Sequence, residues 1–350
     1  MDVNGLLKLM AEKGASDLHL RVPSPPVLRI NGQLIPLQDL PPMAAKDIEM
    51  VFEYITTPEQ RSTFLKDMDL SFSYSVPELA RFRVSVMRQR GTISITFRIV
   101  PFKVLTIDEL GLPQVFKELI LEPKGLILVA GPNGSGRSTT IAALIDHLNE
   151  NVKRNVIIIE DPIEFLHSNK KCIIAQRDIG DDAVSFDIAL AHGLRHDPDV
   201  IIVSEMRDMA TMETAIRAAE TGRLVVGAIS TIGAAQAVES LIDTFSFDQQ
   251  LQIRLRLSQV MVAVLSQTLL PRASGEGRVA AFEIMIANPE MRELIRDGKI
   301  LELSEVMRHN VNHGMQTLEQ ALAELVKMKI ITEDEALMRV SYPERLKELL

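Results

Sequence analysis

The stretch GLILVAGPNGSGRSTT, residues 125–140, decides the fold of this chain. A continuous apolar run ends at Ala130, three glycines follow within six residues (131–136), and a helical pattern begins near Arg137. Glycines at these places allow a tight loop whose backbone N–H groups point inward, and the helix presents the positive end of its dipole to the same point. A glycine-rich structural turn is the alternative, but the flanking strand and helix favour a phosphate-binding loop.

Apolar runs of the same kind recur along the chain after residue 114. They are continuous rather than alternating, which is typical of strands buried on both faces, and helical patterns separate them. The sequence therefore predicts an α/β domain with a parallel sheet covered by helices. The runs are GLILVAG (125–131), NVIIIE (155–160), DVIIVSE (199–205), RLVVGAIS (223–230) and VAAFEIM (279–285).

The first hundred residues predict a separate domain of mixed α and β structure. Helical patterns cover 2–13 and about 44–67, and short alternating runs lie between and after them. The runs at 81–89 and 92–100 predict a hairpin across Gln89–Arg90–Gly91. The resulting division is 1–100 for this domain, 101–113 for a linker, 114–288 for the α/β domain and 289–350 for a helical end.

Composition narrows the class of protein. The chain has 350 residues, 46% hydrophobic and 24% charged, which is typical of a globular protein. Its net charge of −9, without a block of lysine and arginine, argues against a nucleic-acid partner. The lone Cys172 excludes an internal disulfide framework, and the apolar runs are shorter than the roughly 20 residues that cross a bilayer. We expect a cytoplasmic protein without direct membrane insertion.

Carboxylates follow two of the predicted strands. In DPDVIIVSEMRD, a buried strand delivers Glu205 to the carboxyl edge of the sheet, where such folds bind their ligands. There a carboxylate can orient or deprotonate the water that attacks a γ-phosphate, or hold magnesium through a water. Alternatively, Glu205 pairs with Arg207 or Arg217 at the surface.

The second group of carboxylates lies in NVIIIEDPIEF, where Glu160, Asp161 and Glu164 fall within five residues. Three carboxylates so close repel one another unless a cation or hydrogen-bond donors hold them. Beside a phosphate loop they can position magnesium and the attacking water, although alone they would be an ordinary solvated turn. In the loop, the hydroxyl of Ser138 is placed to bind the same ion.

The order and spacing of several motifs, from one end of the chain to the other, resemble the pilus-retraction ATPases, the PilT-type members of the type II/IV secretion ATPase superfamily. These motifs are GASDLHL, RFRVSVMRQRGTISITFRIV, IIEDPIEFLH, VIIVSEMRD with AIRAAETG, LSQTLLPR and GMQTLEQALAELV. The resemblance implies an N-terminal PAS-like α+β domain and a C-terminal RecA-like P-loop domain, with a mostly parallel sheet and a helical C-terminal end. It also implies a hexameric ring, peripheral to the inner membrane at the base of a type IV pilus. The ring would contact an inner-membrane platform protein and use ATP and Mg²⁺ to drive retraction and twitching motility.

The resemblance also assigns roles to individual residues. The loop residues that would bind the nucleotide are Gly134, Ser135, Gly136, Arg137, Ser138 and Thr139, the last three in Walker A positions. The Walker B glutamate would be Glu205, and the aspartate box would hold Glu160, Asp161 and Glu164. Asp161 would join Ser138 as a magnesium ligand. The hairpin arginines Arg83, Arg90 and Arg98 would reach the phosphates from the other domain, unless they lie on a solvated face or in salt bridges.

The sequence departs from the family pattern at the nucleotide. The family loop reads G-P-T-G-S-G-K-S, whereas this chain has Asn133 and Arg137 in place of threonine and lysine. Arg223 and Ser230 stand where the family has the two sensor histidines of its histidine box. Arginine is wider and more directional than lysine, so it is expected to slow ATP turnover.

Two functional hypotheses follow from these departures. One is a working retraction motor in which Arg137 substitutes for lysine. The other is a hydrolysis-impaired ring component that assembles alone or with an active paralogue and regulates or couples force. A RecA-like ATPase that acts on nucleic acid is disfavoured by the acidic charge balance.

Overall fold

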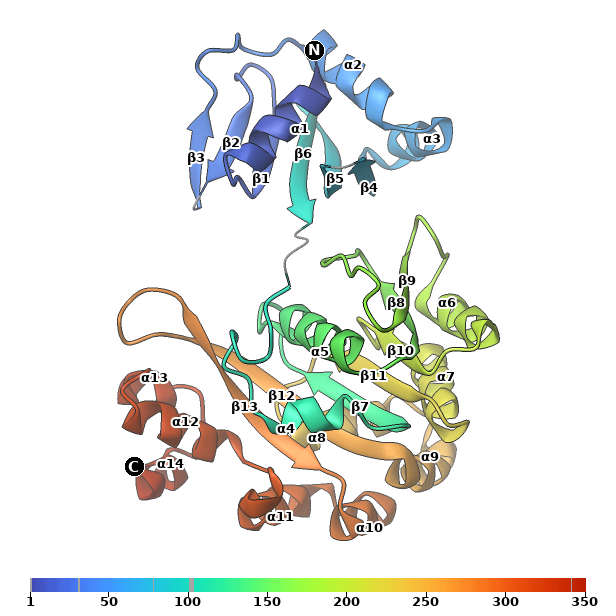
Figure 1. The fold of residues 1–350 in the computed structure, drawn as a ribbon, viewed down its shortest axis with the longest axis vertical. Helices are drawn as coiled ribbons and strands as arrows, with labels where there is room; N and C mark the ends of the chain where they lie inside the picture. The colour runs from blue at the N-terminus through green and yellow to red at the C-terminus, as the bar shows by residue number, and fades with distance from the viewer. Residues whose placement is uncertain (1, 31, 78, 101–103, 341) are drawn as a thin grey trace. The chain divides into compact units, whose positions relative to one another are not determined.

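The computed structural model describes residues 2–30, 32–77, 79–100, 104–340 and 342–350, which form two compact units (Figure 1). The first unit comprises Met1–Lys103 with the short segment Pro162–Leu166, and the second comprises Val104–Asp161 with His167–Leu350. Part of the expected linker, 101–103, lies outside the described residues. The rest belongs to the second unit, because Ile107 and Leu112 are buried in its core.

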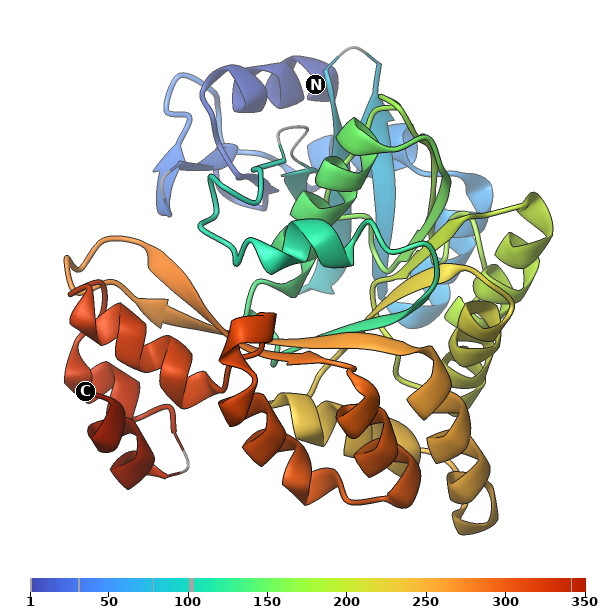
Figure 2. The same ribbon diagram turned by 60° about the horizontal axis from the view of Figure 1, so that its bottom comes forward.

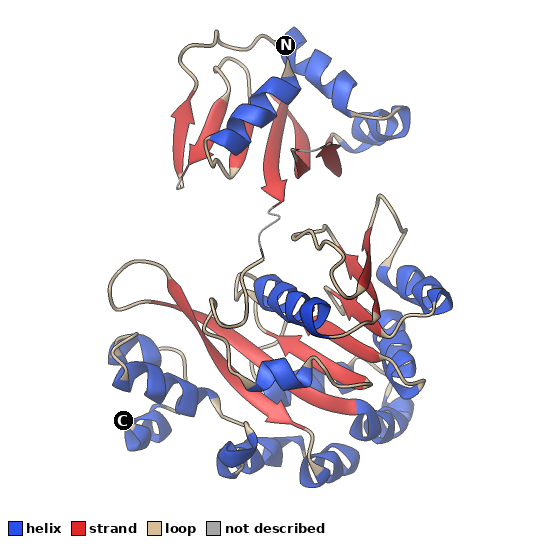
Figure 3. Cartoon of the chain, viewed as in Figure 1, coloured by secondary structure: helices blue, strands red, loops and turns tan. Residues whose placement is uncertain are grey.

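The first unit is a six-stranded antiparallel sheet with three helices (Figure 3). The strand order is β3-β2-β1-β6-β5-β4. The predicted hairpin is present, with Gln89 of β5 opposite Thr92 of β6. Alternate residues of β5, among them Phe82 and Val84, are buried in one core with Leu7 of α1 and Phe52 of α2. The elements are α1 (Val3–Glu12), β1 (Asp17–Leu20), β2 (Val27–Ile30), β3 (Gln33–Pro36), α2 (Ala45–Ile55), α3 (Pro58–Asp67), β4 (Asp69–Val76), β5 (Ala80–Gln89) and β6 (Thr92–Val100).

The second unit contains a seven-stranded sheet in the order β13-β12-β7-β11-β10-β8-β9. All neighbouring strands are parallel except β12 and β13, which form an antiparallel pair. The sheet is therefore mostly parallel. Its strands are β7 (Gly125–Ala130), β8 (Asn155–Glu160), β9 (Ile173–Asp178), β10 (Val200–Val203), β11 (Leu224–Ile229), β12 (Met261–Pro271) and β13 (Arg278–Ile286).

Three details of this sheet differ from the expectation of five parallel strands. The run at 279–285 lies in β13, which is antiparallel and only half buried because it forms the edge of the sheet. Its partner β12 directly follows a helix, so its apolar run has no turn signal before it. The other edge strand, β9, is rich in polar residues and lacks the continuous apolar run of a central strand.

Helices cover both faces of this sheet, as predicted (Figure 2). Leu126 and Leu128 of β7 pack with α6, α7, α8 and α9, whereas Ile127 and Val129 pack on the opposite face with α4 and α5. These helices are α4 (Val115–Leu119), α5 (Arg137–Asn151), α6 (Phe186–Gly193), α7 (Met209–Glu220), α8 (Ala234–Asp243) and α9 (Phe247–Val260).

The C-terminal end is helical, as the sequence predicts. Its helices are α10 (Pro289–Asp297), α11 (Leu303–His309), α12 (Leu318–Lys327), α13 (Glu333–Leu337) and α14 (Pro343–Leu349), and short 3₁₀ turns lie at Leu194–His196, Ile300–Glu302 and Val311–His313. Among the described residues, none of the helices combines the length and the apolarity that a membrane span requires.

Candidate functional site

The phosphate loop joins the end of β7 to the start of α5, as the sequence predicts. Gly131, Gly134 and Gly136 all have positive φ angles, a conformation that favours glycine. Space is also restricted: a Cβ on Gly131 would lie 2.4 Å from Ser135 Oγ, and one on Gly136 would lie 2.8 Å from Gln267 Nε2. The backbone is therefore held in one tight conformation.

The loop fits a polyphosphate. Helix α5 has 15 residues and begins directly after Gly136, which has no side chain to cap its first amides. Such uncapped amides, together with the helix dipole, favour an anion. The hydroxyl of Ser135 is buried and has no hydrogen-bond partner among the residues that the structure describes. A buried hydroxyl without a partner is costly unless a ligand supplies one.

Glu205 lies two residues beyond the end of β10, at the same edge of the sheet as the loop. The residues on either side of it are fixed to the neighbouring strands, because the amide of Ser204 donates to Ile159 O at 2.9 Å and that of Met206 to Ala228 O at 2.8 Å. The backbone that carries the Glu205 carboxylate is thus held in place on both sides.

Glu205 forms an ion pair with Arg207, the alternative that the sequence left open. The side chain of Arg207 is 72% exposed, whereas that of Glu205 is 19% exposed. A pair with one solvated partner contributes little free energy, so Arg207 can be displaced by a ligand at small cost. The ion pair therefore does not prevent Glu205 from acting on a bound nucleotide.

Gly227 of β11 provides the space on which the Glu205 segment depends. A Cβ at this position would lie 2.0 Å from Sδ of the buried Met206. We expect Gly227→Ala to lower the free energy of unfolding by about 1–3 kcal/mol, because Met206 must move. Thermal unfolding measures this loss. Gly193→Ala in α6 is the control: its Cβ would meet only Ile157, at 3.6 Å, so it should not destabilise the chain. Equal melting temperatures for the two variants would contradict the expectation.

The three carboxylates at and just beyond the end of β8 have different surroundings. Glu160 accepts a hydrogen bond from Gln176 Nε2 of β9 at 3.1 Å, Asp161 is exposed, and Glu164 belongs to the segment that groups with the first unit. Within the described ranges, no set of three His, Cys, Asp or Glu side chains is placed to hold a metal ion. The roles expected for these three residues at magnesium and the attacking water stay predictions.

His167, just after these carboxylates, carries a pH-dependent part of the stability. Burial lowers its pKa from 6.5 to about 4. Because the unfolded chain takes up this proton more readily, the stability is complete above pH 6.5 and is lost as the pH falls toward 4. We expect His167→Gln to remove about 2–3 kcal/mol of the loss between pH 7 and 4, as measured by urea unfolding at several pH values. An unchanged pH profile would contradict this assignment.

Comparison with known proteins agrees with this geometry. The family model described as "Type II/IV secretion system protein" matches residues 3–338. The chain belongs to this secretion ATPase family. It is 42% identical over 344 residues to the type IV pilus retractation ATPase PilT of Pseudomonas aeruginosa. The alignment covers 98% of this chain and 99% of that protein. It is also 40% identical over 321 residues to the twitching motility protein of Neisseria gonorrhoeae, in an alignment that covers 92% of this chain and 86% of that protein.

Solved structures of this secretion ATPase family confirm the fold over the whole chain. A crystal structure of the pilus retraction motor PilT with bound ADP superposes with a TM-score of 0.92, at 39% identity and 99% coverage of both chains. The ATPase DotB of Legionella pneumophila gives a TM-score of 0.84 at 25% identity, and the superposition covers 96% of this chain and 94% of that chain. Both domains of the expected architecture are therefore those of a PilT-type secretion ATPase.

The two departures from the family loop contact each other. Arg137 Nη2 donates to Asn133 Oδ1 at 3.3 Å. The guanidinium therefore reaches back along the loop that would hold the phosphates. This direction is available to the planar, forked side chain of arginine and differs from that of a lysine amine on a thin stem.

The two histidine-box positions lie at opposite ends of β11. Arg223 directly precedes the strand and donates to Thr221 O at 3.2 Å, whereas Ser230 directly follows it, beside the phosphate loop. Six residues of strand separate them by about 20 Å. The structure brings Ser230 to the loop edge and leaves Arg223 at the opposite edge, so one phosphate in this chain cannot contact both.

The hairpin arginines lie where the sequence places them in the first unit. Arg83 and Arg98 face each other across β5 and β6, and Arg90 occupies the turn with a φ of 46°. Arg98 Nε donates to Asp17 Oδ1 at 2.8 Å, so this arginine forms the salt bridge that was its alternative reading. Burial raises the pKa of Asp17, but hydrogen bonds from Ser16 and Arg98 outweigh this effect and lower the pKa below its usual value.

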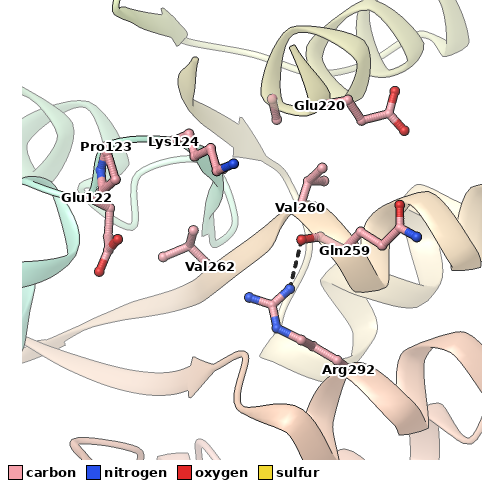
Figure 4. Close-up of a pocket in the computed structure, with 10 residues that line it drawn as sticks. Glu122, Pro123, Lys124, Glu220, Gln259, Val260, Val262 and Arg292 are labelled. Carbon is pink, nitrogen blue, oxygen red and sulfur yellow. Dashed lines mark hydrogen bonds between the residues drawn. The ribbon is translucent and has the colours of Figure 1, made fainter. Parts of the chain in front are cut away.

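Arg292 of α10 lies far from the loop. It lines a pocket with Lys124 and Gln259 at the amino end of β7, whereas the phosphate loop follows the carboxyl end (Figure 4). Its guanidinium donates to the carbonyls of Ser258 at 2.7 Å and Gln259 at 2.9 Å, the last turn of α9. A cation there stabilises the helix terminus, so Arg292 has a structural role in this unit.

Gln267 of β12 is the site residue that sequence reasoning missed. Its Oε1 accepts a hydrogen bond from Thr140 of α5 at 2.7 Å, and its side chain closes the space beside Gly136. The available signal was a glutamine within the family motif LSQTLLPR, in a largely apolar stretch.

Proposed function

We propose that this chain is an ATP-driven motor subunit of a type IV pilus and that it powers pilus retraction and twitching motility. One combination of observations carries the proposal: an amide-lined phosphate loop and Glu205 lie at the same edge of one sheet, in a chain 42% identical, over nearly its whole length, to a pilus-retraction ATPase. Its relatives act in pilus retraction and twitching motility by name.

In this proposal the chain's own groups bind and orient the nucleotide. The amides of residues 134–138 hold the β- and γ-phosphates, and the hydroxyls of Ser135 and Ser138 complete the contacts. Magnesium bound to the polyphosphate would neutralise charge on its oxygens, with Ser138 as a ligand and Asp161 as a candidate outer contact. Glu205 orients the attacking water, and Ser230 lies where it can report on the γ-phosphate. Glu160 and Glu164 remain candidates for positioning the same water.

The assembly proposed is a hexamer of this chain, or a ring mixed with a paralogue, at the cytoplasmic base of the pilus against an inner-membrane platform protein. In such a ring Arg83, Arg90, Arg98 and Arg223 have a second nucleotide within reach, that of a neighbouring subunit. In this proposal the hairpin arginines and Arg223 have a role that they do not have in one chain.

The hydrolysis-impaired ring component stays a second candidate because Arg137 is turned toward Asn133. Backbone amides supply much of the binding energy for phosphate, so both candidates bind nucleotide. They differ in turnover, and we propose that turnover is slowed rather than absent.

Nucleotide binding is tested by thermal unfolding with ADP. At a concentration 100 times its Kd, ADP should stabilise the folded chain by about 2.7 kcal/mol and raise the melting temperature by several degrees. Gly136→Val should abolish this rise, because any side chain at that place meets Gln267 and the backbone requires a positive φ. A wild-type melting temperature that is independent of ADP and ATP would refute the proposed function.

A further inference from the structure

Two neighbouring residues of β12, Ser266 and Gln267, are buried polar residues in a strand that is otherwise largely apolar. Only 5% of Ser266 and 3% of Gln267 is exposed. Because side chains alternate along a strand, the two point to opposite faces of the sheet. Gln267 faces α5, and Ser266 faces α8.

On the α5 face, Gln267 fixes both ends of the phosphate loop. Its Oε1 accepts from Thr140 Oγ1 at 2.7 Å in the first turn of the helix. Its Nε2 would lie 2.8 Å from a Cβ on Gly136, and its backbone oxygen would lie 2.7 Å from one on Gly131. Gln267 therefore lies close against both ends of the loop.

On the α8 face, Ser266 holds the start of the helix that follows Ser230. The amide of Gly233 donates to Ser266 Oγ at 2.9 Å, and the amide of Ala234 donates to Glu283 Oε1 at 2.8 Å. Ser266 and Glu283 are direct partners across β12 and β13. Two side chains of one sheet edge thus cap α8.

The segment between β11 and α8 lies beside the phosphate loop, since Gly131 N donates to Ile229 O at 3.2 Å. Within this segment, the hydroxyl of Thr231 is buried and has no hydrogen-bond partner among the described residues. It therefore presents a donor without a ligand near the edge where the phosphates would bind.

We propose that Ser266 and Gln267 are positioning residues that tie the phosphate loop to the 230–233 segment across the sheet. Binding of a polyphosphate in the loop then alters the order of the segment at the start of α8, because Ser266 and Gln267 connect the two. The response to a bound polyphosphate rests on the proposed function. The structural connection between the two segments, called the tie below, does not.

The tie is tested first without nucleotide, by amide hydrogen exchange of peptides covering 131–140 and 230–236. Ser266→Ala and Gln267→Met should each increase exchange at least about threefold in both segments, because each loosens the shared strand. Ser266→Thr keeps the hydroxyl and should restore protection. The control Ser258→Ala removes another buried serine, whose hydroxyl donates to Leu255 O at 2.7 Å, and should change neither segment.

The proposal is wrong if each substitution increases exchange only in the segment that the substituted residue contacts. It is also wrong if Ser258→Ala increases exchange in both segments. Exchange in β10 serves as the reference, because a general loss of folding would increase it as well.

Saturating ADP then separates the tie from the proposed function. Wild type should gain protection in both segments, whereas Gln267→Met should gain it in 131–140 alone. Protection of 230–236 that persists in Gln267→Met would contradict the signalling role. If wild type gains no protection in either segment, the proposed nucleotide function fails, and the exchange without nucleotide still decides the tie.

Discussion

Glu205→Gln is expected to lower magnesium-dependent phosphate release by about 100-fold or more. The carboxylate is held at the loop edge by the hydrogen bonds of Ser204 and Met206, and a glutamine of the same shape cannot accept a proton from the attacking water. ADP affinity should stay within about twofold, because the effect concerns the transition state and not the bound diphosphate. Phosphate release is measured in the wild-type chain and in Arg137→Lys, where faster turnover makes the loss easier to quantify.

Arg207→Gln is the matched control for Glu205→Gln. Both substitutions remove the same ion pair, but only one removes the carboxylate. Turnover in Arg207→Gln should stay within about threefold of wild type, since a pair with an exposed partner contributes little. If the two variants lose activity equally, the ion pair and not the carboxylate is what matters, and the role assigned to Glu205 is wrong.

Arg137→Lys is expected to increase turnover by about tenfold or more. The arginine donates to Asn133 and is directed along the loop, whereas a lysine amine is a compact charge that reaches the β- and γ-oxygens. A tenfold change corresponds to about 1.4 kcal/mol of transition-state stabilisation, a modest part of what a well-placed cation supplies. Steady-state phosphate release at saturating ATP measures the change.

Asn133→Thr separates two explanations of the Arg137 effect. If Asn133 holds the guanidinium away from the phosphates, Asn133→Thr alone changes turnover, and its effect and that of Arg137→Lys do not multiply. Independent effects would mean that the hydrogen bond is incidental. A rate in Arg137→Lys equal to or below that of wild type would contradict the claim that arginine slows this motor.

The central fold was predictable because its signals are local. The phosphate loop combines an apolar strand, three glycines and a helix start within 16 residues, and each of these follows from backbone geometry alone. The strands β9 and β12 were missed because their pairing is decided by distant partners, and neither has a flanking local signal of its own.

Contacts within the site were harder to predict than its members. Thr140 and Gln267 are separated by 127 positions, so no sequence window contains both. Glu205 was located by its strand, but its ion pair with Arg207 depends on side-chain directions after the strand ends. The separation of Arg223 from Ser230 was implicit in the six-residue strand between them.

The most direct measurement is a structure determined with magnesium and an excess of a non-hydrolysable ATP analogue. The account predicts β- and γ-phosphate oxygens within hydrogen-bond distance of the amides of residues 134–138, with Glu205 facing the γ-phosphate. A loop that contains no phosphate under these conditions, with the Arg137 guanidinium filling its place, would contradict the account.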